Sequence, residues 1–154
     1  MFGIYNDNFP PVLDGVGVTA QNYAYWLHEK GYDVSVITPY APKSKEVLCA
    51  AKYPICRYIS VPIPFRPPYR YGLPYLDFSF MHKWSRMKFD LVHAHCPFTS
   101  GHLAYKAAKK QNIPMVATFH SKYRQDFEHN VPCKPIVDYM VKYIINFFEF
   151  KFVR

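Results

Sequence analysis

Three short stretches of the sequence carry residue types suited to a polar or anionic substrate. Residues 6–17 read NDNFPPVLDGVG and lead into a predicted helix, whose first N–H groups and dipole would attract a phosphate. Residues 93–97 read HAHCP, and residues 118–124 read TFHSKYR, where a histidine is followed by two cations. Imidazole exchanges hydrogen bonds and protons near neutral pH, and cations neutralise an anionic group. Each stretch therefore predicts part of a binding or catalytic site.

The elements that would position these stretches alternate along the chain. Amphipathic helices are expected from Thr19, where apolar residues recur at helical spacing, and from an N-cap at Thr99 or Ser100 to Asn112. Strands separated by such helices favour a parallel sheet with helices on both faces, because parallel neighbours need a long crossover. We therefore predict an α/β, Rossmann-like sheet of order 3-2-1-4-5. The expected strands are residues 2–5, 34–38, 58–61, 90–94 and 115–119.

Ligands of such a sheet bind beyond the carboxyl ends of the strands, where the strand order reverses. The loops that begin near Asn6, His95 and His120 should therefore converge on one crevice. Gly15 and Gly17 are candidates for phosphate binding, but their spacing matches neither the dinucleotide fingerprint nor the P-loop. Glycines that only make a turn are an equal alternative, and a structural histidine is the alternative at His120.

Two histidines and a nearby cysteine suggest a metal site but do not specify one. His93 and His95 share one face of a strand, and Cys96 follows them. Ligands at this spacing with no second clustered pair do not specify a tetrahedral site, so we expect no metal and no cofactor. We expect His93 to be a sheet residue and His95 to line the cleft. The four cysteines lack CxxC spacing and are expected to be reduced thiols of a cytosolic protein.

The chain is basic, with 19 Lys and Arg against 11 Asp and Glu. A proline-rich stretch from Pro62 to Pro74, expected to be an ordered surface loop, precedes a predicted helix over residues 75–88. Cations beside aromatic residues suit the headgroup level of an anionic membrane, whereas a solvated basic face over an aromatic core is the alternative. Single-stranded nucleic acid would explain the charge but not the strand-end loops, so none is expected. The membrane-contact candidates are Arg66, Arg70, Lys83, Trp84, Arg86 and Lys88.

Taken together, these motifs resemble one known family. NDNFPPVLDGVGVTAQNYAYWLHEKGYDVSVITP, FRPPYRYGLPY, FDLVHAHCPFTSGHLAYKAAKKQNIPMVATFHSKYRQDF and the helix after Pro135 are similar to the N-terminal domain of family 4 glycosyltransferases of GT-B architecture. The last long stretch looks most like the subgroup that glycosylates diacylglycerol or related lipids. The resemblance implies transfer of a sugar from a nucleotide-sugar donor to an acceptor such as a membrane lipid, with retention of configuration and usually without a bound metal.

The resemblance also implies roles for individual residues. Gly15 and Gly17 would approach the donor diphosphate, and His120 would be the catalytic histidine that contacts the transferred sugar. Asp14 and His95 would fall in cleft-lining segments. The cations after His120 would lie on the same cleft or acceptor side, namely Lys122 and Arg124.

The resemblance implies a larger protein as well. A GT-B enzyme has two Rossmann-like halves, and the donor-binding half is not represented in residues 1–154. We therefore expect a single, C-terminally incomplete acceptor-side domain that is inactive alone, cytoplasmic or peripheral on the inner face of a membrane. The predicted helix over residues 136–152 is too apolar for a free surface, which favours a missing partner surface. A non-catalytic Rossmann-like binding or regulatory module is the rival interpretation.

Overall fold

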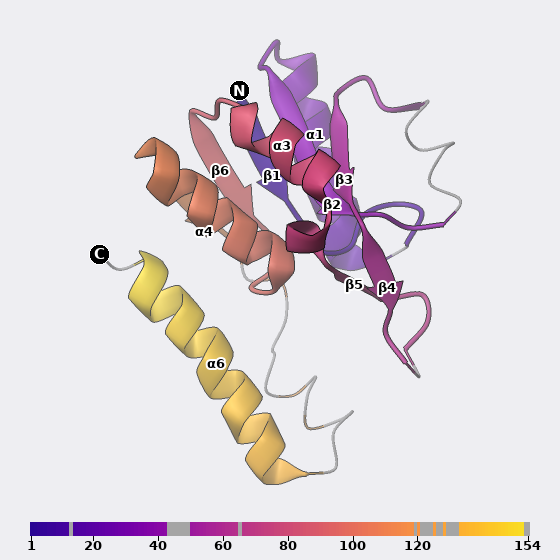
Figure 1. Ribbon diagram of the computed structural model, residues 1–154, viewed down its shortest axis with the longest axis vertical. Helices are drawn as coiled ribbons and strands as arrows, with labels where there is room; N and C mark the ends of the chain where they lie inside the picture. Colours follow the sequence, from indigo (N-terminus) through magenta and orange to yellow (C-terminus); the bar gives the residue numbers. More distant parts are fainter. Residues whose placement is uncertain are drawn as a thin grey trace. The chain divides into compact units, whose positions relative to one another are not determined.

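The computed structural model describes residues 1–12, 14–42, 50–64, 66–118, 120, 125, 128 and 133–152 (Figure 1). The chain divides into two compact units, Met1–Thr118 and Phe119–Arg154, which are described separately.

The first unit is built on a five-stranded parallel sheet of order β3-β2-β1-β6-β7. The α/β, Rossmann-like prediction is confirmed. The five strands carry the numbers 3-2-1-6-7 and not the predicted 3-2-1-4-5. The reason is that two short strands, which lie between β3 and β6 in the sequence, pair with each other outside this sheet. The strands are β1 (Phe2–Tyr5), β2 (Val34–Pro39), β3 (Ile55–Tyr58), β6 (Leu91–Ala94) and β7 (Met115–Ala117).

Helices cover both faces of this sheet. Helix α1 (Gly15–Glu29) packs Ala20 and Ala24 against one face, which Ile4 and Val36 share. Helices α3 (Phe78–Arg86) and α4 (Thr99–Gln111) pack on the opposite face, as Figure 1 shows. Side chains of successive strand residues point to opposite faces, so β1 contributes Ile4 to one core and Tyr5 to the other.

The stretch between β3 and α3 differs from the prediction. The expected strand over residues 58–61 is split, because β3 ends at Tyr58 and β4 (Ser60–Pro62) pairs antiparallel with β5 (Arg70–Gly72). The expected loop therefore contains a strand, followed by the 3-10 helix η1 (Pro74–Leu76). A Cβ at Gly72 would lie 2.3 Å from the Tyr58 ring, so glycine lets this hairpin close over β3.

The bounds of three helices also differ from the prediction. Helix α1 begins at Gly15 and not at Thr19, because the Asp14 side chain accepts a hydrogen bond from the Gly17 N–H. Helix α3 is shorter than predicted. Helix α4 begins after Phe98, so neither Thr99 nor Ser100 is its N-cap. It ends as expected before Asn112, whose φ of 54° forms a left-handed C-cap.

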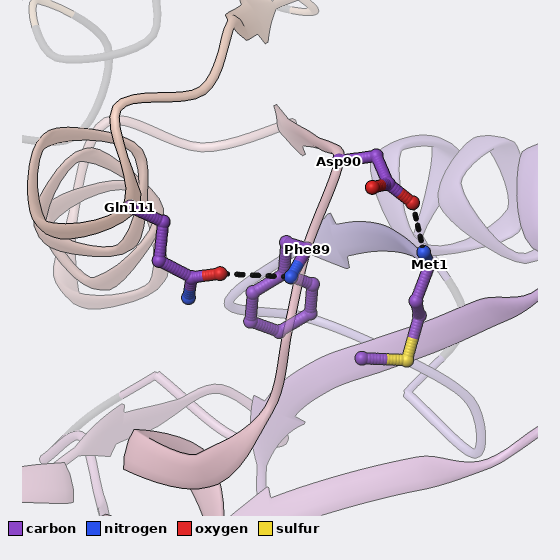
Figure 2. Close-up of polar contacts among 4 residues, drawn as sticks. All are labelled: Met1, Phe89, Asp90 and Gln111. Carbon is purple, nitrogen blue, oxygen red and sulfur yellow. Dashed lines mark hydrogen bonds and ion pairs between the residues drawn. The ribbon is translucent and has the colours of Figure 1, made fainter.

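Polar contacts stabilise the edge of the sheet at which β1 and β6 begin. The Met1 amino group forms an ion pair with Asp90, and Gln111 of α4 accepts a hydrogen bond of 2.9 Å from the Phe89 N–H (Figure 2). Gln111 also donates a hydrogen bond to the Met87 carbonyl at 3.1 Å. One amide side chain of α4 therefore binds two backbone groups of the segment that leads into β6.

The second unit contains α6 (Lys134–Phe152). Val137, Val141 and Ile144 recur at helical spacing and are buried, whereas Tyr139 remains 73% exposed. The helix thus presents apolar side chains on more than one face, in line with its sequence. Among the described residues, no helix combines the length and hydropathy that a membrane span requires.

Candidate functional site

The loops that follow β1 and β6 meet at the carboxyl edge of the sheet, where the strand order reverses. Asn6 is completely buried, and its side chain donates to the Asn8 carbonyl. The Cys96 thiol, which lies just after β6, donates to the Asn6 Oδ1 at 2.8 Å. Strands β1 and β6 are parallel neighbours, so this contact extends their pairing into the loops. Two of the three predicted loops are therefore joined directly.

Two neighbouring imidazoles lie against the middle of α1. The ring centroids of His93 and His95 are 4.0 Å apart, and the Tyr23 ring of α1 lies 5.1 Å from one and 5.4 Å from the other. His93 Nε2 lies 2.7 Å from the Thr118 hydroxyl, which ties β6 to the end of β7. His93 is thus the sheet residue that the sequence predicts.

His95 departs from its prediction. The side chain is completely buried beneath Tyr23, so it does not present an open ring to the cleft. Its backbone N–H donates to the Tyr5 carbonyl at 2.9 Å, which continues the β1–β6 pairing by one residue. His95 therefore supports the edge of the site from below. Within the described part of the chain, no group of three or more His, Cys, Asp or Glu side chains gathers in a metal-binding arrangement.

The two glycines of the first loop have different environments. A Cβ at Gly17 would lie 3.0 Å from the Asp14 carboxylate and 3.1 Å from the Asn8 carbonyl, so this glycine lets α1 approach the β1 loop closely. Gly15 is exposed, and a Cβ there would meet no atom within 4 Å. Close packing of α1 against the β1 loop therefore accounts for Gly17, and its role toward the donor diphosphate stays a prediction. The first-turn N–H groups of α1 at Gly15 and Val16 are the groups that an anion could reach.

A buried carboxyl that the sequence analysis missed lies between the two loops. Asp7 Oδ1 accepts a hydrogen bond of 3.0 Å from the Ser100 N–H, in the first turn of α4, and its Oδ2 is buried. Burial raises the pKa of Asp7 to about 6, while the hydrogen bond from the Ser100 N–H acts in the opposite direction. Burial also raises the pKa of the Cys96 thiol, so Cys96 is a neutral structural donor.

The predicted site residues are thus brought together in part. Asp14, Gly15, Gly17 and His95 all lie at one edge of the first unit, linked through Tyr23 and the Asn6 contacts. His120 is half-buried and belongs to the second unit, so its convergence with Gly15 and His95 remains a prediction. Lys122 and Arg124 lie outside the described residues.

The predicted membrane contacts separate into three environments. Trp84 is only 4% exposed, and its indole N–H donates to the Tyr5 hydroxyl at 2.9 Å, so its assignment to a membrane surface is wrong. The Arg70 guanidinium donates to the Ser60 hydroxyl and carbonyl at 2.7 and 2.8 Å and holds the hairpin together. The remaining candidates are exposed, namely Arg66, Lys83, Arg86 and Lys88.

Large apolar side chains lie exposed in the same region. Val61 and Tyr71 face each other across the β4–β5 hairpin, and both are exposed. The following residues of η1 and α3 are more exposed still, with Leu76 at 64% and Phe78 at 83%. The Asp77 carboxylate accepts from the Ile59 N–H at 3.1 Å and so ties the start of α3 to the hairpin. We call Val61, Tyr71, Tyr75, Leu76 and Phe78 the hairpin patch.

The chain matches the model of glycosyltransferase family 4 over residues 13–150 and belongs to that family. Its fold agrees with one Rossmann-like half of a GT-B enzyme. It is 32% identical over 129 residues to the alpha-monoglucosyldiacylglycerol synthase of Acholeplasma laidlawii, covering 84% of this chain and 31% of that protein. It is 26% identical over 148 residues to the protein of the same name from Streptococcus pneumoniae, covering 95% and 32%.

The chain therefore spans about a third of the length of these curated relatives. Among solved structures, the C-terminal domain of a hydrogenase from Pyrococcus furiosus is 19% identical, with 77% of this chain and 87% of that chain covered and a TM-score of 0.42. That likeness is too distant to support an argument about fold or function.

Proposed function

We propose that this chain forms the acceptor-side half of a retaining glycosyltransferase that moves a sugar from a nucleotide-sugar donor to a membrane lipid of the diacylglycerol type. The observation that carries the proposal is the 32% identity, over 84% of the chain, to an enzyme whose name gives monoglucosyldiacylglycerol as its product. The joined loops after β1 and β6 agree with it, because they form the switch point at which such sheets bind ligands.

In the proposed reaction, the bond between the anomeric carbon and the diphosphate oxygen breaks, and a bond from that carbon to the acceptor hydroxyl oxygen forms. The hydroxyl proton leaves with the diphosphate. The first turn of α1 at Gly15 would face the developing charge on the diphosphate, where a helix N-terminus stabilises an anion. Asp14 and Gly17 would hold this turn in place.

The remaining roles follow from the family resemblance. His120 would be the catalytic residue that contacts the transferred sugar, with Lys122 and Arg124 on the cleft side. A second, donor-binding half would complete the site, so we propose that the chain alone does not turn over. No metal or cofactor is assigned to the first unit.

A membrane lipid as acceptor suggests a function for the hairpin patch. The exposed aromatic and aliphatic side chains of the patch would bury apolar area at the acyl boundary, while the exposed cations Arg66, Lys83, Arg86 and Lys88 would face anionic headgroups. We propose that this surface rests on the membrane that supplies the lipid acceptor. Trp84 and Arg70 would support the surface from within and would not touch lipid.

A transfer assay tests the proposed function. The chain alone and the product of the whole reading frame that contains it are each given a panel of labelled nucleotide sugars and diacylglycerol-containing vesicles. We expect labelled glycolipid from the complete product and none from the chain alone. Donor or lipid binding without transfer by the complete product would favour the rival interpretation of a non-catalytic module.

A further inference from the structure

Helix α4 lacks a cap of its own. Its N-cap position is occupied by Phe98, whose side chain has no hydrogen-bond acceptor, and Ser100 in its first turn is completely buried. A buried first-turn N–H without an acceptor would destabilise the helix start. The acceptor comes from Asp7, 93 residues earlier in the chain, at 3.0 Å. The carboxyl of Asp7 thus does what an N-cap side chain ordinarily does.

The groups around this carboxyl come from the end of β3, the loop after β6 and the start of α4. The Tyr58 hydroxyl from β3 and the Ser100 hydroxyl lie near it, and neither hydroxyl has a hydrogen-bond partner among the described residues. Cys96 lies close enough to interact with its charge, and Asp14 interacts in turn with Cys96. Among the ion pairs of the described residues, none involves Asp7. The first turn of α4 is therefore the hydrogen-bonding partner of this carboxyl.

The helix start that Asp7 holds also fixes the loop between β6 and α4. That loop contains His95 and Cys96, and Cys96 donates to Asn6 of the β1 loop. On its other side, the Thr99 hydroxyl reaches the Gly72 carbonyl of the hairpin at 3.4 Å. A shift of the first turn of α4 would therefore move both the imidazole pair and the hairpin contact.

We propose that Asp7 is a positioning residue of the carboxyl-edge site, which caps α4 from a distance and thereby holds the His95 loop against the β1 loop. Its Oδ2 is buried, so Asp7 acts through the start of α4, which it caps. The inference concerns the geometry of the site, and it stands whichever reaction the site performs.

The test follows the Ser100 amide of the full chain by NMR, at equilibrium and in hydrogen exchange. In Asp7→Ala, we expect exchange of the Ser100 amide to accelerate roughly tenfold or more relative to other α4 amides, and the ring signals of His95 to move. In Asp7→Asn, the amide oxygen still accepts the bond, so protection and ring signals should persist. In the unmodified chain, the Ser100 shift should titrate near pH 6, and in Asp7→Asn it should not.

A matched control is Asp77, which caps α3 by accepting from the Phe80 N–H at 2.9 Å. Asp77→Ala should weaken protection at Phe80 and leave Ser100 and His95 unchanged. The proposal is overturned if Asp7→Ala leaves Ser100 protected and the His95 signals in place. Should Asp7→Ala fail to fold, the titration of the unmodified chain against Asp7→Asn decides, because a Ser100 amide that does not follow the Asp7 carboxyl overturns the proposal equally.

Discussion

The indole N–H of Trp84 donates a hydrogen bond of 2.9 Å to the hydroxyl of Tyr5, and both side chains are buried between α3 and the sheet. This bond joins the helix before β6 to the first strand of the chain. The aromatic side chains of α3 lie in two different environments. Phe80 and Trp84 belong to the core, whereas Phe78 lies outside it.

The first prediction concerns this buried pair. Trp84→Phe removes the indole donor and leaves the Tyr5 hydroxyl buried without it, so we expect a loss of about 1–3 kcal/mol in the free energy of unfolding. Urea denaturation followed by circular dichroism measures the loss. The same variant should bind anionic vesicles as the unmodified chain does. A selective loss of vesicle binding with unchanged stability would return Trp84 to the membrane surface.

The second prediction concerns the hairpin patch. Phe78→Ser should lower partitioning onto vesicles of phosphatidylcholine and phosphatidylglycerol by roughly tenfold or more, since burial of one large apolar side chain contributes ~1.5–3 kcal/mol. Its unfolding free energy should stay nearly unchanged, because the side chain is 83% exposed. Sedimentation with vesicles measures the partitioning.

A matched control for this prediction is Trp26→Ser on α1. Trp26 is also a large, exposed aromatic residue, at 61%, but it lies outside the patch. The Trp26→Ser variant should leave vesicle binding unchanged. Equal losses in both variants would show that exposed aromatic area in general, and not the hairpin patch, drives the binding.

The sequence contained enough to predict most of the sheet, because the strand and helix periods are local properties. The burial of Trp84 was also within reach, since Phe80 and Trp84 are four residues apart and lie on one helix face. The role of Asp7 was not, because its partner Ser100 is distant in sequence and the pair follows no motif. The β4–β5 hairpin was missed because each strand has only three residues, too few for a period to show.

A third prediction compares the two glycines of the α1 start. Gly17→Ala should cost about 1–3 kcal/mol of unfolding free energy, because its Cβ would press against the Asn8 carbonyl. Gly15→Ala should instead be neutral or stabilising by up to ~1 kcal/mol, since alanine favours the helix and meets open space. Thermal unfolding measures both. A large destabilisation by Gly15→Ala would contradict the open environment of that residue.

A fourth prediction gives the pH dependence of stability. Burial raises the pKa of the Asp7 carboxyl from 3.8 to about 6, so the folded state binds this proton more tightly than the unfolded state does. The stabilising contribution is therefore complete below pH 4 and is lost as the pH rises through 6. Asp7→Asn should flatten this dependence and raise the unfolding free energy near neutral pH by at most ~3 kcal/mol.

Urea denaturation of the unmodified chain and of Asp7→Asn across this pH range checks the fourth prediction. The difference between the two removes the contribution of the histidines, which titrate in both proteins. A difference that grows as the pH falls below 4 would reverse the predicted sign and would indicate a carboxylate that its surroundings stabilise in the charged form.

The last prediction tests the histidine that the resemblance assigns to catalysis. In the complete product, His120→Ala should lower kcat by roughly 10²-fold or more, the usual effect of removing one group that stabilises the transition state. Loss of a contact made only in the transition state lowers kcat and kcat/KM together, so KM for the donor should change little. His82→Ala provides the control, since His82 is an exposed histidine on α3. Equal activities of His120→Ala and His82→Ala would remove His120 from the reaction.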